Sequence, residues 1–242
     1  MVSIFIKEIR SFLSSLIAYI VVAVFLLAIG LFMWIYDDTN ALEYGMASMD
    51  TLFMMAPWVF VFLISAITMR SFAEEKKTGT IEFITTKPIT DTQIILGKFF
   101  AGLTLVLFAL IPTLLYYFTI HQLGSPQGNI DTGGMWGSYI GLVLLGAGYV
   151  SIGLFASSLT DNQIVSFVLS AFLCFFTYSV LGQLSGLFPT GKLNYYTEWL
   201  GIDFHYQSIS RGVVDTRDVI YFISLVAVFL GLTKLSFSRR KW

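Results

Sequence analysis

The chain has 242 residues, of which 56% are hydrophobic, 17% are aromatic and only 12% are charged, and its net charge is −1. Soluble domains carry roughly a quarter charged residues, so a water-soluble core of this length could not hide so much apolar surface, and part of the solvent must be lipid. The near-neutral charge excludes a nucleic-acid binder, which needs a basic face. The single cysteine, Cys174, lies in an apolar run, where it forms no internal disulfide and no metal site.

Residues 1–15 place apolar side chains at helical spacing and charged side chains elsewhere. This pattern predicts an amphipathic helix that lies in the membrane interface. The alternative is a polar lead-in to the first membrane span. The apolar set is Val2, Phe5, Ile6, Ile9, Phe12 and Leu13.

Six apolar runs follow, and each is long enough to cross about 30 Å of hydrocarbon at about 1.5 Å per residue. The first is too long for a signal-peptide core and precedes no small-residue cleavage site, so we treat it as a retained span. We therefore predict an all-α membrane protein with a single transmembrane domain over residues 1–242. The predicted spans are 16–36, 52–69, 99–120, 138–156, 164–188 and 219–237.

The basic residues predict the orientation, because cytoplasmic loops are rich in Lys and Arg. With the N-terminus inside, eleven basic residues lie on the cytoplasmic side and only Lys192, Arg211 and Arg217 lie outside. Both termini are then cytoplasmic. The inside set is Lys7, Arg10, Arg70, Lys76, Lys77, Lys87, Lys98, Lys234, Arg239, Arg240 and Lys241.

The longest charged segment, residues 70–98, separates the second span from the third. Residues 72–77 read as a charged continuation of the second span, which Gly79 can end in a left-handed conformation. Pro88 forbids a continuous helix through the centre of the loop. Thr90 and Gln93 have the spacing of a capping box, which begins a helix that runs into the third span. The loop is predicted to be a structured docking element, with a solvated connector as the alternative.

The other internal cytoplasmic loop is short and covers residues 157–163. Thr160 and Gln163 again have capping-box spacing, here for the fifth span. With Asp161, they are candidates for a second contact with the cytoplasmic partner. A tight turn explains the loop almost as well.

The longest external stretch, residues 189–218, mixes aromatic and charged residues. Aromatic rings with polar tips suit the level of the lipid headgroups, so short interfacial or re-entrant helices are expected here. His205 has no histidine or cysteine partner at metal-ligand spacing, so the stretch predicts no metal site.

The sequence contains no convincing catalytic or nucleotide-binding motif. Gly186-x4-Gly191-Lys192 is similar to a phosphate-binding loop, but Leu193 stands where Ser or Thr should hold magnesium. The chain is therefore not expected to hydrolyse ATP by itself, and no cofactor is assigned to it. The spans contain almost no acids or histidines, which argues against an ion-coupled secondary transporter and against an intramembrane enzyme.

Small residues and one proline shape the predicted spans. Gly137-x-x-x-Gly141 and Gly182-x-x-x-Gly186 allow close approach of helix backbones, within the chain or across a dimer. Pro112 is expected to kink the third span, with a freed carbonyl satisfied by neighbouring helices or by a hydroxyl such as that of Thr113.

The loop at residues 70–98 resembles the cytoplasmic loop of the type-2 ABC exporter permeases. The resemblance consists of an acidic and basic helix, a Gly79-Thr80-x-Glu82 step, a Pro88-Ile-Thr90 turn and Gly97-Lys98 before the third span. Six spans with both termini inside extend it over the whole chain. Residues 158–163 and 210–222 resemble a narrower branch, the permease subunit of the bacterial gliding-motility ABC transporter.

This resemblance implies a separate ABC ATPase subunit, which holds ATP and magnesium and docks under residues 74–90. It also implies a second permease copy, or a related membrane subunit with a large external domain, in the bacterial inner membrane. Glu75 is expected to make a charged contact and Gly79 to set the helix angle. The full set expected to couple to the ATPase is Arg70, Glu74, Glu75, Gly79, Thr80, Glu82 and Pro88.

Two functions remain open at this stage. The chain is either the membrane subunit of an export or motility complex, or a non-transporting anchor that transmits ATPase strokes to envelope proteins. A polar or amphiphilic lateral cavity between the second and fifth spans, seen in a dimer of the chain, would favour transport.

Overall fold

The computed structural model describes residues 1–42, 47–85, 88–186 and 191–238, and all regular structure within them is helical. Six helical segments are long and apolar enough to span a membrane, which confirms the predicted fold class. These segments are Leu16–Trp34, Asp50–Lys77, Asp91–Leu123, Thr132–Leu159, Gln163–Ser185 and Thr216–Ser238. Lys87, Arg239, Arg240, Lys241 and the middle of the Gly186–Lys192 motif lie outside the described residues.

Some spans consist of more than one helix. The elements in chain order are α1 (Val2–Leu13), α2 (Leu16–Trp34), α3 (Asp50–Thr68), α4 (Ala73–Lys77), α5 (Thr80–Thr85), α6 (Asp91–Leu110), the 3₁₀ turn η1 (Ile111–Thr113), α7 (Leu114–Leu123), α8 (Thr132–Leu159), α9 (Gln163–Phe175), the π-helix η2 (Phe176–Val180), α10 (Leu181–Ser185), α11 (Lys192–Leu200), α12 (Ile202–Ile209) and α13 (Thr216–Ser238).

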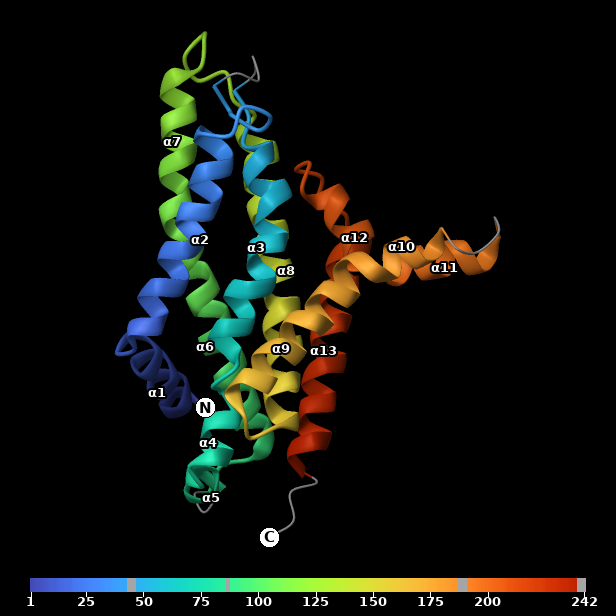
Figure 1. The fold of residues 1–242 in the computed structure, drawn as a ribbon. Coiled ribbons are helices and arrows are strands. Elements are labelled where there is room, and N and C mark those ends of the chain that lie inside the picture. Colours follow the sequence, from blue (N-terminus) through green and yellow to red (C-terminus); the bar gives the residue numbers. More distant parts are fainter. Residues whose placement is uncertain (43–46, 86–87, 187–190, 239–242) are drawn as a thin grey trace.

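The helices run up and down in one bundle, with short elements at its two ends (Figure 1). The helices α1, α4 and α5 lie at one end, which we call the inner end in line with the predicted orientation. The helices α10, α11 and α12 lie toward the opposite, outer end, where α11 projects sideways from the bundle. Two short helices, α11 and α12, are thus present in the described part of the external stretch, residues 191–218.

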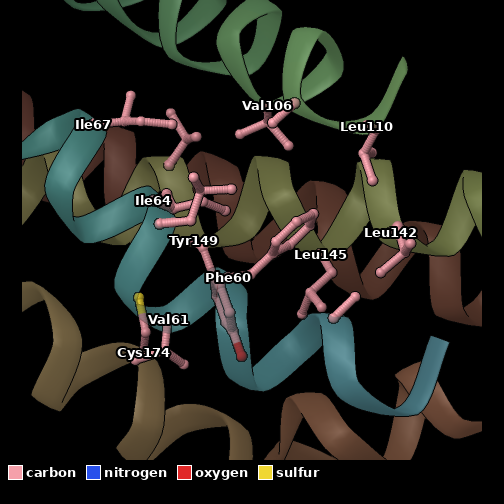
Figure 2. Close-up of a cluster of buried hydrophobic side chains, with 14 of the residues drawn as sticks. Phe60, Val61, Ile64, Ile67, Val106, Leu110, Leu142, Leu145, Tyr149 and Cys174 are labelled. Carbon is pink, nitrogen blue, oxygen red and sulfur yellow. The ribbon is translucent and has the colours of Figure 1, made fainter. Parts of the chain in front are cut away.

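The helix α8 forms the centre of the bundle and contacts α3, α6, α9 and α13. Its small residues explain this position, because neighbouring backbones can approach them closely. A side chain at Gly153, for example, would meet the Thr68 hydroxyl at 2.1 Å. Figure 2 shows the core on one side of α8, where Phe60, Val61, Ile64, Ile67, Val106, Leu110, Leu142, Leu145, Tyr149 and Cys174 come together from α3, α6, α8 and α9.

The predicted glycine motifs have different surroundings. Gly137 and Gly141 lie against the backbone of Gly212 and the side chain of Ile209, so this motif packs within the chain. A side chain at Gly182 would meet no atom within 4 Å.

The N-terminal helix α1 packs mainly against α6. Ile4 is its buried residue and contacts α6 at Gly97. Val2 and Ile6 remain exposed on other faces. One side of α1 therefore packs against the bundle, and its other apolar side chains are exposed and available to contact lipid.

Proline interrupts the third span as predicted. The α-helix gives way to the 3₁₀ turn η1 at Pro112, and the Thr113 hydroxyl donates to the Leu110 carbonyl at 2.6 Å. The second span, in contrast, does not continue as one helix into the charged segment: α3 ends at Thr68 and α4 begins at Ala73.

Candidate functional site

The helices α4 and α5 form a small helical hairpin at the inner end. Gly79 separates α4 from α5 and has φ = +69°, the left-handed conformation predicted for it. The next helix begins with the predicted capping box: the Thr90 hydroxyl accepts from the Gln93 N–H at 3.3 Å, and the Gln93 side chain accepts from the Thr90 N–H at 3.2 Å. The left-handed glycine and the capping box predicted from the sequence therefore determine where the helices of this loop end and begin.

The base of the hairpin is bonded to the end of α8. The Ser157 hydroxyl accepts hydrogen bonds from the N–H groups of Phe72 and Ala73, at 3.0 and 3.1 Å. Helix N-termini have unsatisfied N–H groups, so Ser157 serves as a cap for α4 from another helix. The Ser158 carbonyl accepts from the Lys76 ammonium and from the Ser236 hydroxyl of α13. This cap explains why the predicted continuous helix breaks before Ala73.

A group of four charged residues joins the hairpin to α1 and α6. We call Lys7, Glu8, Glu75 and Lys98 the charge cluster. The Lys98 ammonium lies 2.7 Å from Glu8 Oε1 and 2.9 Å from Glu75 Oε2, and it donates to the Ser71 carbonyl at 2.6 Å. The ammonium donates hydrogen bonds to Glu8 and Ser71, whereas its contact with Glu75 is an ion pair without a hydrogen bond. Lys98 is only 2% exposed.

Lys7 completes the charge cluster from α1 by bonding to Glu75 and lying 3.2 Å from Glu8. Burial disfavours the charged forms of Lys7 and Glu8, but the neighbouring opposite charges outweigh it. The pKa of Lys7 therefore lies above its ordinary value and the pKa of Glu8 below it. The cluster therefore stabilises the charged forms of Lys7 and Glu8.

The predicted coupling residues fall into two groups. Glu75 is 7% exposed and belongs to the charge cluster, and Arg70 and Glu74 line a cavity beside it. Thr80, Glu82 and Pro88 are exposed, and Thr80 also lines the edge of this cavity.

The sequence analysis did not single out Phe83, which is 74% exposed on α5. A large aromatic side chain at the tip of a charged loop is the signal that could have identified it.

The second inner turn lies beside the hairpin, since α4 contacts both α8 and α9. The predicted capping box of Thr160 and Gln163 is wrong. The cap of α9 is Asn162, whose side chain accepts from the Ile164 N–H at 2.9 Å, while the Thr160 hydroxyl accepts from the Asn162 N–H at 3.1 Å. Asn is as good a cap as Thr, and Gln163 is then the first residue of the helix. Asp161 is exposed at this turn.

A cavity of about 1040 Å³ opens at the outer end between the second and fifth spans. Its walls come from α3, η2, α10, α11 and α12. Aromatic side chains such as Trp58, Tyr178 and Phe204 alternate with polar ones. The charged residues of its lining are Asp50, Glu198, Asp203 and Arg211.

The π-helix η2 gives the fifth span its shape at this cavity. Tyr178 and Ser179 belong to η2 and line the cavity, and the ring of Tyr178 lies edge-on to Trp58 at a centroid distance of 5.3 Å. Single π-turns within α-helices occur frequently at functional sites. Nothing in the pattern of apolar residues predicted this turn.

Behind the cavity, His205 forms a buried pair with Asp218. Its Nδ1 lies 2.7 Å from Asp218 Oδ1 and its Nε2 lies 2.9 Å from the Trp199 carbonyl oxygen. Its ring stacks on Tyr221 at a centroid distance of 3.9 Å. His205 thus fastens α12 to α13.

The fold and these sites define a multi-pass membrane protein with a structured inner loop and an amphiphilic outer cavity. A family model described as ABC-2 family transporter protein matches residues 34–239. The chain therefore belongs to the ABC-2 family of transporter proteins, which are membrane subunits and not themselves the ATPase. No curated protein matches the chain.

Proposed function

We propose that the chain is the permease subunit of an ATP-driven complex in which a separate ABC ATPase docks on the α4–α5 hairpin. The observation that carries this proposal is the form of the hairpin: its tip is exposed, while its base is bonded to α1, α6 and α8. ATP and magnesium belong to the partner subunit. The exposed residues Thr80, Glu82, Phe83 and Pro88 would contact it, with Thr160, Asp161 and Gln163 as a second contact.

The bonds at the base of the hairpin suggest how a movement of the ATPase would be transmitted to the membrane-spanning helices. Force on α5 would pass through Gly79 to α4, and from α4 through Glu75 and Lys98 into α6. Glu75 was expected to touch the ATPase directly. Because its carboxylate faces Lys7 and Lys98, we propose instead that it transmits the movement.

Co-purification tests the docking proposal. The tagged chain is purified from its native membrane in mild detergent, and the accompanying proteins are identified by mass spectrometry. Phe83→Ala should reduce the yield of a co-purifying ATPase at least about tenfold, since hydrophobic anchors dominate such contacts. Phe108→Ala is the matched control, because Phe108 is also exposed and lies on α6 ten residues beyond the end of the loop. Equal ATPase yield from both variants would contradict docking at α5.

The outer cavity favours transport over the alternative of a non-transporting anchor. An anchor needs no hollow between its spans, whereas this cavity combines aromatic, polar and charged walls suited to an amphiphilic cargo. We propose that cargo passes through it.

Gly182→Trp separates these two functions. The open space beside Gly182 admits a large side chain, which would fill part of the cavity. In the reconstituted complex, the variant should keep its ATPase but lose the stimulation of ATP hydrolysis by native lipid extract. A complex that behaves like the wild type would favour the anchor.

The direction of transport and the cellular role are also part of the proposal. The resemblance of residues 158–163 and 210–222 to the gliding-motility permease supports export in a bacterial inner membrane. It also supports pairing with a second copy or with a related subunit that has a large external domain. Deletion of the gene in a gliding bacterium should abolish spreading on agar, and unchanged spreading would exclude this branch.

A further inference from the structure

A second cavity, of about 290 Å³, lies at the inner end between α1, the α3–α4 junction and α6. Its polarity changes along the bundle axis. Arg70, Glu74 and Lys98 line it near the loop, while Ala66 and Leu105 line it about one to two helical turns deeper in the bundle. A site with charged groups at one end and apolar walls at the other fits an amphiphile.

Two charged residues of this cavity are not used by the charge cluster. Lys7 and Lys98 are balanced by Glu8 and Glu75. Arg70 makes no ion pair within the part of the chain that the structure describes: one guanidinium nitrogen donates to Ser15 Oγ at 3.1 Å, and its Nε is buried without a partner. A buried donor without an acceptor calls for an explanation, and a bound ligand provides one.

Glu74 lies one turn after Arg70, and its N–H donates to the Arg70 carbonyl at 3.3 Å. The two side chains nevertheless form no ion pair with each other in the described structure. The cavity thus offers one guanidinium and one carboxylate, close together and both available. This arrangement suits a ligand that carries an anion and a cation a short distance apart.

We propose that this cavity binds the headgroup of an ethanolamine phospholipid from the inner leaflet. The guanidinium of Arg70 would hold the phosphate, for which its planar fork is well suited, and the carboxylate of Glu74 would accept from the ammonium. The acyl chains would follow the wall of Ala66 and Leu105. The exposed apolar residues of α1 place this cavity at the boundary between headgroups and hydrocarbon.

The lining also selects against other headgroups. A quaternary ammonium, as in choline, favours an aromatic cage, and Phe12 is the one aromatic residue that the structure places in the lining. A purely anionic headgroup would meet the carboxylates of Glu8, Glu74 and Glu75 without bringing a cation for them. A primary ammonium beside a phosphate satisfies both ends of the site.

Native mass spectrometry of the full chain, with any subunits that co-purify, tests this proposal. The protein is exchanged into micelles that contain equal amounts of phosphatidylethanolamine, phosphatidylcholine and phosphatidylglycerol. The wild type should retain the ethanolamine lipid at least about tenfold over the others, since charge-assisted hydrogen bonds at both ends favour it. Arg70→Gln and Glu74→Gln should each remove this preference. Lys77→Gln, an exposed residue of the same hairpin outside the cavity, should keep it.

Ala66→Phe provides a second route that leaves every charge in place, because it fills the apolar part of the cavity. If Arg70→Gln fails to fold, loss of the lipid in a folded Ala66→Phe variant still supports the proposal. Equal retention of all three lipids by the wild type, or an unchanged preference in folded Arg70→Gln, would overturn it. Binding of free phosphoethanolamine without binding of the lipid would overturn the lipid assignment. No step uses ATP, so the result is independent of ATPase docking.

Discussion

The two ends of the molecule use charge in opposite ways. At the inner end, the charge cluster joins α1, α4 and α6, and every one of its four residues lies in an ion pair. At the outer end, Asp50, Glu198, Asp203 and Arg211 line a cavity more than three times larger and form no ion pair in the described part of the chain. Charge that holds helices together is buried and paired, whereas charge that lines the open outer cavity is not.

This difference has a physical basis. A buried charge without a partner costs several kcal/mol, while a charge that faces water costs little. The inner end therefore depends for its stability on the cluster, and the outer charges are free to serve recognition. Equal substitutions at the two ends should show this contrast directly.

Removal of Lys98 should produce the largest effect. Lys98→Met removes the buried ammonium from Glu8 and Glu75 and leaves both carboxylates with Lys7 alone, which should cost about 3 kcal/mol of stability. Thermal unfolding in detergent, followed by fluorescence-detected gel filtration, measures the loss. Lys77→Met is the control, since Lys77 is exposed on α4.

A double variant identifies the cause of that loss. In Lys98→Met with Glu75→Gln, only one carboxylate, that of Glu8, is left to share Lys7, so part of the lost stability should return. If the double variant is less stable than Lys98→Met alone, the apolar packing of Lys98 and not its charge is what matters.

The outer end contains one closed pair, and breaking it should give the second-largest effect. His205→Phe leaves the buried carboxylate of Asp218 without its partner at 2.7 Å, which should cost about 2 kcal/mol. The chain's other histidine supplies the control: His121→Phe should have little effect because His121 is only partly buried and makes no ion pair within the described structure. Equal unfolding temperatures for the two variants would show that the pair is dispensable.

The parts of this structure that were predictable have local causes. Apolar runs of spanning length predicted six membrane helices, because the bilayer sets their length. Gly79, Pro112 and the Thr90–Gln93 box were read correctly since backbone conformation and capping act over a few residues. Each of these signals sits next to the feature that it determines.

The parts that were not predictable depend on distant residues. Nothing near Glu75 indicates that it meets Lys7 and Lys98, residues 68 and 23 positions away along the chain. The break before Ala73 depends on Ser157 of α8, and the choice of Asn162 over Thr160 as a cap depends on where α9 begins. Contacts between helices determine these details, and a single sequence contains no direct signal for them.

Gly79→Val should have a smaller effect on stability and a specific effect on coupling. A Cβ atom added at Gly79 has no other atom within 4 Å, so the substitution causes no clash. It does force a β-branched residue to φ = +69°, which costs about 1 to 2 kcal/mol locally. We expect the chain to insert normally while ATP hydrolysis is uncoupled from function. Gly79→Asn is the matched control, since Asn tolerates this conformation. Normal activity of Gly79→Val would contradict the role of this bend.

The smallest expected effect comes from the same chemical change made at each end. Glu198→Gln, in the outer cavity, should change the stability by no more than about 0.5 kcal/mol, because Glu198 is exposed and unpaired in the described structure. Glu8→Gln, at the inner end, removes one of two carboxylates from the buried Lys98 ammonium and should cost more than Glu198→Gln. Unfolding temperatures of the two variants, measured side by side in one detergent, give the comparison. If they fall equally, pairing within the charge cluster contributes nothing beyond what an exposed carboxylate does, and the contrast between the two ends is wrong.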